Sequence, residues 1–271
     1  MVIATSREEL SAARQNMRGQ IGFAPTMGAL HAGHLSLIER AKKENDFVAL
    51  SIYVNPTQFG AGEDFARYPR KKEADIALCR AAGVDLLFMP ENLYGANEPI
   101  VCAPLIGASI LEGEIRRGHF DGVLTIVTKL FNLIKPMRAY FGKKDAQQLW
   151  LIQNMVKSFF MDIEIVACET TRENNGLALS SRNAYLSKSE KTDALKLSRS
   201  LFEASRLIKK NETKTAAIVA AILDILQPLK VDYIAIVDRE FNALETIKKG
   251  ETIILIAARV GATRLIDNMW I

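Results

Sequence analysis

Short β-branched or apolar runs alternate with amphipathic helical segments through the first two thirds of the 271-residue chain. The strand-like runs are residues 21–24, 47–54, 84–89, 138–141 and 162–168. Between them, apolar residues at helical spacing mark residues 35–43, 72–82, 123–134 and 146–160. Strands that alternate with helices in this way build a parallel sheet with helices on both faces. The pattern therefore predicts an α/β fold with a doubly wound, Rossmann-like parallel sheet.

The alternation ends near Thr170, and the remaining chain has a different order of elements. A polar loop at residues 172–176 is followed by two helical stretches and then by three strand-like runs. These are residues 188–209, 213–229, 231–237, 252–258 and 263–268. Helices followed by adjacent strands indicate a small α+β domain with antiparallel pairing. We expect two domains, residues 1–170 and 171–271.

Charge and hydropathy exclude several classes of partner. The formal net charge of +4 is mild, and no contiguous basic stripe with interleaved aromatic residues is present, so we expect no nucleic-acid partner. No apolar run reaches the roughly 18 residues that a membrane span needs, and no signal-peptide pattern opens the chain. Cys79, Cys102 and Cys168 lack the spacing of a disulfide framework or a zinc site. We expect a cytoplasmic protein with reduced thiols and no membrane partner.

The histidine loop (residues 27–34) follows the first predicted strand and leads directly into an apolar helix. In open α/β sheets, ligands lie beyond the carboxyl ends of the strands, where a helix N-terminus offers N–H groups to a phosphate. Gly28 and Gly33 allow a close approach of the backbone. His31 and His34 can lie on one side of the first helical turn and donate to phosphate oxygens. This arrangement predicts ATP-dependent adenylation of a small carboxylic acid.

The alternative for the histidine loop is a Gly-rich turn with two surface histidines. Two of the three histidines in the chain fall in this loop, which favours the phosphate-binding interpretation. A metal site is disfavoured because the loop supplies no third ligand. A Walker-type loop is excluded because the Gly-Lys-Ser/Thr ending is missing.

The glutamine turn (residues 55–58) follows the second predicted strand. Its amides, Asn55 and Gln58, can orient a hydroxyl or a carboxylate without adding charge. Taken alone, Asn-Pro indicates a turn and Gln58 a surface residue. The position of this turn beside the histidine loop favours substrate binding instead.

Residues 142–145 end a later strand and carry groups suited to a nucleotide. A lysine cation suits the phosphates, Asp145 suits the ribose hydroxyls, and Gly142 permits a close approach. Asp145 can equally serve as a helix N-cap.

Ser180, Ser181 and Arg182 follow the interdomain loop, and two hydroxyls and a guanidinium in succession can wrap phosphate oxygens. The alternative is an ordinary Ser-Ser turn. Residues 116–122 either line the site or form a solvated loop before a core helix.

With these segments in this order, the chain resembles the pantothenate synthetase family, the ligases that join pantoate to β-alanine. Its histidine loop also resembles the HIGH signature of a wider nucleotidyltransferase superfamily. The resemblance runs from Pro25 to Asn268. It implies that the carboxylate of pantoate attacks the α-phosphorus of ATP, giving pantoyl adenylate and pyrophosphate. The amine of β-alanine then attacks the adenylate and releases AMP. A homodimer, and Mg²⁺ bridging the phosphates, are also implied.

The resemblance also implies roles for individual residues. His34, His31 and Lys144 correspond to catalytic positions, with His34 near the α-phosphate. Gln58 and Gln148 correspond to pantoate- and β-alanine-binding positions. The implied ATP-binding set is Met27, Gly28, Ala29, Leu30, His31, Ala32, Gly33, His34, Gly142, Lys143, Lys144, Asp145, Thr171, Leu179, Ser180, Ser181 and Arg182. No residue is implied as a metal ligand.

Two positions depart from the family pattern. Lys143 stands where an acid is frequent and makes its loop more basic, and Ala146 stands where an aromatic residue is frequent. Two other functions remain open at this point. One is a nucleotidyltransferase that keeps the nucleotide in its product, and the other is a non-enzymatic RNA-binding module.

Overall fold

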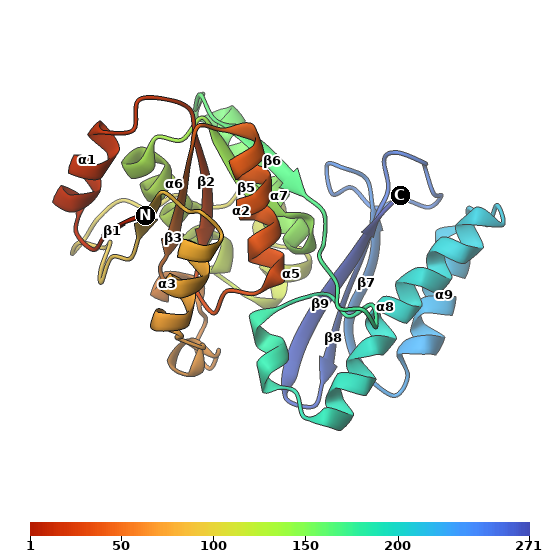
Figure 1. Ribbon diagram of the computed structural model, residues 1–271. Helices are drawn as coiled ribbons and strands as arrows, with labels where there is room; N and C mark the ends of the chain where they lie inside the picture. The colour runs from red at the N-terminus through yellow and green to blue at the C-terminus, as the bar shows by residue number, and fades with distance from the viewer. The chain divides into compact units, whose positions relative to one another are not determined.

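The computed structural model describes all residues 1–271, which divide into two compact units (Figure 1). The first unit comprises Met1–Lys143 and Gln147–Glu169, and the second comprises Lys144–Ala146 and Thr170–Ile271. No helix in either unit is both long and apolar enough to cross a lipid bilayer.

The first unit is built on six strands, all of which pair in parallel. They are β1 (Val2–Ala4), β2 (Ile21–Thr26), β3 (Phe47–Ile52), β4 (Leu86–Phe88), β5 (Arg138–Gly142) and β6 (Glu164–Cys168), in the spatial order β1-β4-β3-β2-β5-β6. The chain builds outward from β2 through β3 and β4, then crosses to the other side of β2 to add β5 and β6. This reversal beside β2 confirms the predicted doubly wound sheet.

Helices cover both faces of this sheet. Successive residues of a strand point to opposite faces, so neighbouring residues of one strand pack against different helices. Ala24 and Tyr140 share a core with residues of the helices α2 and α3. Their neighbours Phe23 and Phe141 pack edge-on against Phe131 of α6, with ring centroids 6.4 and 6.3 Å apart. The helices of the unit are α1 (Arg7–Gln15), α2 (Ala32–Glu44), α3 (Lys72–Ala81), α4 (Leu105–Ala108), α5 (Leu111–Ile115), α6 (His119–Ile134) and α7 (Ala146–Ser158), of which Ala146 groups with the second unit.

Several boundaries differ from the sequence expectation for identifiable reasons. The elements β1 and α1 are not marked by periodicity, since β1 has three residues and Leu10 is the buried residue of α1. The capping box between Ser6 and Glu9 is the local signal for α1. Strand β2 continues past the expected end at residue 24 through Pro25. A proline is accommodated there because the pairing of β2 with β5 stops at Phe23.

The second unit contains two helices and an antiparallel sheet in the order β7-β8-β9, which confirms the predicted α+β region. Its elements are α8 (Lys188–Lys209), α9 (Thr215–Leu226), β7 (Lys230–Val237), β8 (Ile253–Val260) and β9 (Thr263–Trp270). Apolar residues of both helices and of the sheet form one buried cluster. Helix α9 ends at Leu226, earlier than expected, because Gln227 precedes Pro228 and the residue before a proline disfavours the helical conformation.

Candidate active site

Three of the predicted site segments leave the sheet from the same edge. Strand β2 lies between β3 and β5, and the register pairs Thr26 with Ile52 and Phe23 with Ala139. Because these strands are parallel, the histidine loop, the glutamine turn and the residues after Gly142 all begin at their carboxyl ends. This edge, at the point where the strand order reverses, is where doubly wound sheets bind ligands.

The two histidines of the histidine loop cap helix α2 through each other. His31 is the N-cap residue, and its Nδ1 accepts from the Gly33 N–H at 3.1 Å. The Nδ1 of His34 accepts from the His31 N–H at 3.3 Å, and the two ring centroids lie 4.1 Å apart. Because each Nδ1 is an acceptor, the neutral ring carries its proton on Nε2. The Gly33 N–H is therefore bonded within the cap.

A buried carboxylate that the sequence interpretation missed holds the start of the same loop. Asp75 of α3 is 3% exposed, and its two oxygens accept from the backbone N–H groups of Ala29 and Leu30 at 2.9 and 2.8 Å. Gly28 and Ala29 have φ angles of 86° and 49°, a left-handed conformation that is unfavourable for alanine. The available signal was the position of Asp75 four residues before Cys79, on the buried stripe of the helix.

Gln58 is oriented by its own turn. Its Oε1 accepts from Asn55 Nδ2 at 3.0 Å, and its Nε2 donates to the sulfur of Met27 at 3.2 Å, which joins the glutamine turn to the histidine loop. Asn55 Nδ2 also donates to Gly122 O, and Asn55 Oδ1 accepts from the hydroxyls of Thr57 and Tyr94. Asn55 is 1% exposed and orients the Gln58 amide.

The start of α6, from His119, packs against the glutamine turn, whereas Arg117 and Gly118 are exposed. Arg116 makes two hydrogen bonds to Glu63 at 2.7 and 2.8 Å, while its neighbour Arg117 is exposed. His119 is 7% exposed. A Cβ at Gly122 would lie 2.4 Å from the carbonyl oxygen of Thr57, so only glycine permits this close packing.

The buried imidazole of His119 makes the stability of the protein sensitive to acid. Burial and the charge of Arg116 lower its pKa from 6.5 to about 4. Between these two values the unfolded chain binds a proton that the folded protein excludes, so stability falls as the pH drops from about 6.5 to 4. We expect His119 to contribute up to about 3 kcal/mol of this loss. Urea unfolding at pH 7 and pH 4.5 should show a smaller loss for His119→Asn, whereas equal losses would contradict this assignment.

The two departures from the family pattern are Lys143, which forms an ion pair, and Ala146, which is buried. The Lys143 ammonium pairs with the Glu169 carboxylate, so the additional positive charge of this loop is balanced. Ala146 is 2% exposed at the start of α7. A Cβ at Gly142 would meet no atom within 4 Å, which leaves the space at the end of β5 open.

The two adjacent glutamines of α7 have different surroundings. Gln147 is buried, and its amide is used by the N–H of Glu112 and the carbonyls of Gly107 and Ile110, each at 3.0 Å. It is therefore structural. Gln148 is only half-buried.

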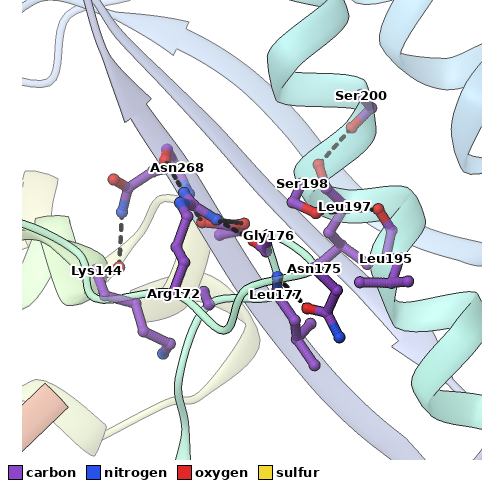
Figure 2. Close-up of polar contacts among 12 residues, drawn as sticks. Lys144, Arg172, Asn175, Gly176, Leu177, Leu195, Leu197, Ser198, Ser200 and Asn268 are labelled. Atoms are coloured by element: carbon purple, nitrogen blue, oxygen red, sulfur yellow. Dashed lines mark hydrogen bonds and ion pairs between the residues drawn. The ribbon is translucent and has the colours of Figure 1, made fainter. Parts of the chain in front are cut away.

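In the second unit, Arg172 fixes the loop that leads to Ser180. Its guanidinium pairs with the Asp267 carboxylate at 2.7 and 2.8 Å. It also donates to Gly176 O at 3.1 Å, and both Arg172 and Gly176 are labelled in Figure 2. The Leu179 N–H donates to Thr171 O at 3.0 Å, and the Ser180 hydroxyl accepts from the Arg182 N–H at 3.3 Å. Residues 180–182 thus lie at the start of a 3-10 turn, Ser181–Tyr185, at the end of an ordered loop.

Lys144 and Asp145 group with the second unit. The carbonyl of Lys144 accepts from Asn268 Nδ2 at 2.7 Å, a contact drawn in Figure 2. Its ammonium lies 3.6 Å from Asp145 Oδ1. Asp145 is the last residue of the 3-10 turn Lys143–Asp145, directly before α7.

The strand order and the loops at its reversal point define a doubly wound α/β protein of the class that binds ligands at the carboxyl edge of its sheet. Residues 2–270 match the model of the pantoate-beta-alanine ligase family. The chain belongs to this family and is a pantothenate-forming ligase, which confirms the resemblance.

Known relatives match along the whole chain. Pantothenate synthetases of Campylobacter fetus and Wolinella succinogenes are each 54% identical to it, over all of both chains. The crystal structure of pantothenate synthetase from Thermus thermophilus is similar with a TM-score of 0.94, at 42% identity over 99% of each chain. The ligase from Francisella tularensis, complexed with beta-gamma ATP and beta-alanine, gives a TM-score of 0.83 at 37% identity, covering 100% of this chain and 97% of the other.

Proposed function

We propose that this chain condenses pantoate with β-alanine through a pantoyl-adenylate intermediate, converting ATP to AMP and pyrophosphate, as a step of coenzyme A biosynthesis. The observation that carries the proposal is the contact between the histidine loop and Gln58 at the reversal point of the sheet. The loop proposed to bind phosphate lies beside a neutral amide proposed to orient a carboxylate, an arrangement that suits the activation of a carboxylate by ATP.

The histidine loop is proposed to bind the ATP phosphates. With both Nδ1 atoms used as acceptors, His31 and His34 present Nε2–H groups as donors. We assign His34 to the oxygens of the α-phosphate, where negative charge builds up as pantoate attacks, and His31 to a position beside it. Donors already fixed before the reaction stabilise that charge without reorganisation. Met27, Gly28, Ala29, Leu30, Ala32 and Gly33 form the rest of this ATP contact.

Further ATP contacts are proposed on both units. In the first, Gly142 offers open space for the nucleotide, and Lys143 lies beside it. In the second, Asp145 is assigned to the ribose and the backbone of Thr171 to the adenine, with Leu179 as a further ATP contact. The phosphate contacts of this unit are Lys144, Ser180, Ser181 and Arg182, with Lys144 taking a catalytic role. The Ser180 oxygen already accepts one hydrogen bond, and its O–H is the group proposed for phosphate.

Gln58 and Gln148 are proposed to bind pantoate and to orient its carboxylate. A carboxylate is ionised at neutral pH and is a competent nucleophile without a general base. The contribution of the protein is therefore positioning and charge stabilisation, with no covalent enzyme intermediate.

Replacing Gln58 or Gln148 by alanine is expected to raise the KM for pantoate about tenfold or more and to leave the KM for ATP within about twofold, the effect of losing one or two hydrogen bonds to the substrate. Initial rates of AMP release at varied pantoate and ATP concentrations measure both constants. An increase confined to the KM for ATP would show that the role given to these residues is wrong. Gln147→Ala, which removes a structural amide, should reduce thermal stability instead.

Mg²⁺ is proposed to accompany ATP, bound through phosphate oxygens. The chain contains no group of three or more His, Cys, Asp or Glu residues able to hold a metal ion by themselves. The homodimer and the cytoplasmic location remain predictions.

The proposed function is tested by AMP release with each substrate omitted in turn. We expect release only when ATP, pantoate and β-alanine are all present. A nucleotidyltransferase that keeps the nucleotide in its product would form no AMP. An RNA-binding module would instead give a salt-sensitive mobility shift with RNA, which we do not expect.

A further inference from the structure

His119 is held between the backbone of Gln58 and the side chain of Arg116. Its Nδ1 lies 2.7 Å from the carbonyl oxygen of Gln58, and its Nε2 lies 2.9 Å from Arg116 Nη1. We propose that His119, aligned by Arg116 and Glu63, is a positioning residue that holds the glutamine turn in the conformation that binds pantoate. This inference rests on the proposed role of Gln58.

The partners of His119 fix its tautomer. A carbonyl oxygen can only accept, so Nδ1 carries the proton and donates to Gln58 O. A guanidinium can only donate, so Nε2 accepts from Arg116. A protonated imidazole would place an N–H against that guanidinium. The ring is therefore neutral, and its hydrogen bond to Gln58 has one direction.

The far side of Arg116 is fixed by Glu63. Burial alone would raise the pKa of the Glu63 carboxyl, but the hydrogen bonds and charge of Arg116 outweigh this and hold its pKa below the ordinary value. The carboxylate, the guanidinium and the imidazole thus form a directed chain that ends on the Gln58 carbonyl. Glu112 is the other charged group that acts on His119.

Gln58 is consequently held at both ends. Asn55 fixes its side-chain amide, and His119 fixes its backbone carbonyl, 61 residues away in sequence. The start of α6 packs so closely here that a Cβ at Gly122 would overlap the backbone of Thr57. Loss of the His119 contact should therefore displace the Gln58 side chain from pantoate without affecting the ATP-binding loop directly.

Two substitutions of His119 separate the effect of losing its hydrogen bond to Gln58 from the effect of losing the imidazole ring. Asparagine places an amide N–H near the former Nδ1 and can still donate to Gln58 O, whereas glutamine places its amide near the former Nε2 and loses that bond. We expect His119→Gln to raise the KM for pantoate about tenfold, the value of one buried hydrogen bond. His119→Asn should recover most of this loss, with a KM within about threefold of the unmodified protein. The KM for ATP should change in neither. Equal KM values for pantoate in the two variants, or an equal rise in the KM for ATP, would overturn the proposal.

Controls separate failure of this inference from failure of the proposed function. If Gln58→Ala leaves the KM for pantoate unchanged, the role of Gln58 is wrong; if Gln58→Ala raises it and His119→Gln does not, the positioning role is wrong. Arg117→Ala, an exposed neighbour of Arg116, should have no effect. Nitrogen-15 NMR of the unmodified protein at pH 7 gives a readout that needs no variant to fold. It should show a neutral, Nδ1-protonated His119, and an Nε2-protonated or charged ring would overturn the proposal.

Discussion

Replacing His34 by alanine is expected to lower the rate of pyrophosphate release by about 10²–10³-fold, because a preorganised donor to the reacting phosphate is lost. The affinity for ATP should weaken far less, since the other contacts proposed for the histidine loop bind the phosphates in the ground state. Single-turnover release of pyrophosphate and equilibrium binding of ATP measure the two quantities separately. Unchanged turnover in the His34→Ala variant would show that the role assigned to His34 is wrong.

Two further variants of His34 test which nitrogen matters. Asparagine can retain the acceptor that caps the His31 N–H but removes the Nε2–H donor, so it should be nearly as slow as alanine. Glutamine places an N–H near the former Nε2 and should recover part of the rate. The reverse order would mean that His34 acts through the helix cap and not on the phosphate.

Replacing Asp75 by alanine is expected to destabilise the protein by about 2–5 kcal/mol, because the buried N–H groups of Ala29 and Leu30 lose their acceptor. The left-handed conformation at Ala29 would lose its support, so the histidine loop should rearrange and the KM for ATP should rise. Urea unfolding and AMP release measure the two effects.

Glu73, an exposed acid on the same helix, provides the matched control. Glu73→Ala removes the same charge without a buried partner and should change both quantities little. If Asp75→Ala and Glu73→Ala have equal effects, the hydrogen bonds that Asp75 accepts from the histidine loop contribute nothing to stability or to the KM for ATP.

The elements that the sequence predicts are those long enough to show a continuous apolar run or stripe. Helix α8 has the bounds that were predicted, residues 188–209, and the structure shows that a capping box of Ser187 and Glu190 begins it. Strand β1 and the short helices α4 and α5 were not expected, because three to five residues are too few to show a period.

The candidate site was predictable where its residues are local in sequence. The histidine loop, the glutamine turn and Gly142 each follow a strand, and parallel topology brings such segments to one edge. Asp75 and His119 were not predicted as positioning groups, because their partners lie 46 and 61 residues away. The contacts of Asn55 with Tyr94 and Gly122 were not predicted either, since both partners come from distant parts of the chain.

The central claim is that ATP activates pantoate before β-alanine takes part, and isotope exchange between pyrophosphate and ATP tests it most directly. With pantoate present and β-alanine absent, labelled pyrophosphate should be incorporated into ATP, and the exchange should be lost in the His34→Ala variant. Exchange without pantoate, or exchange that requires β-alanine, would contradict the formation of pantoyl adenylate at the histidine loop.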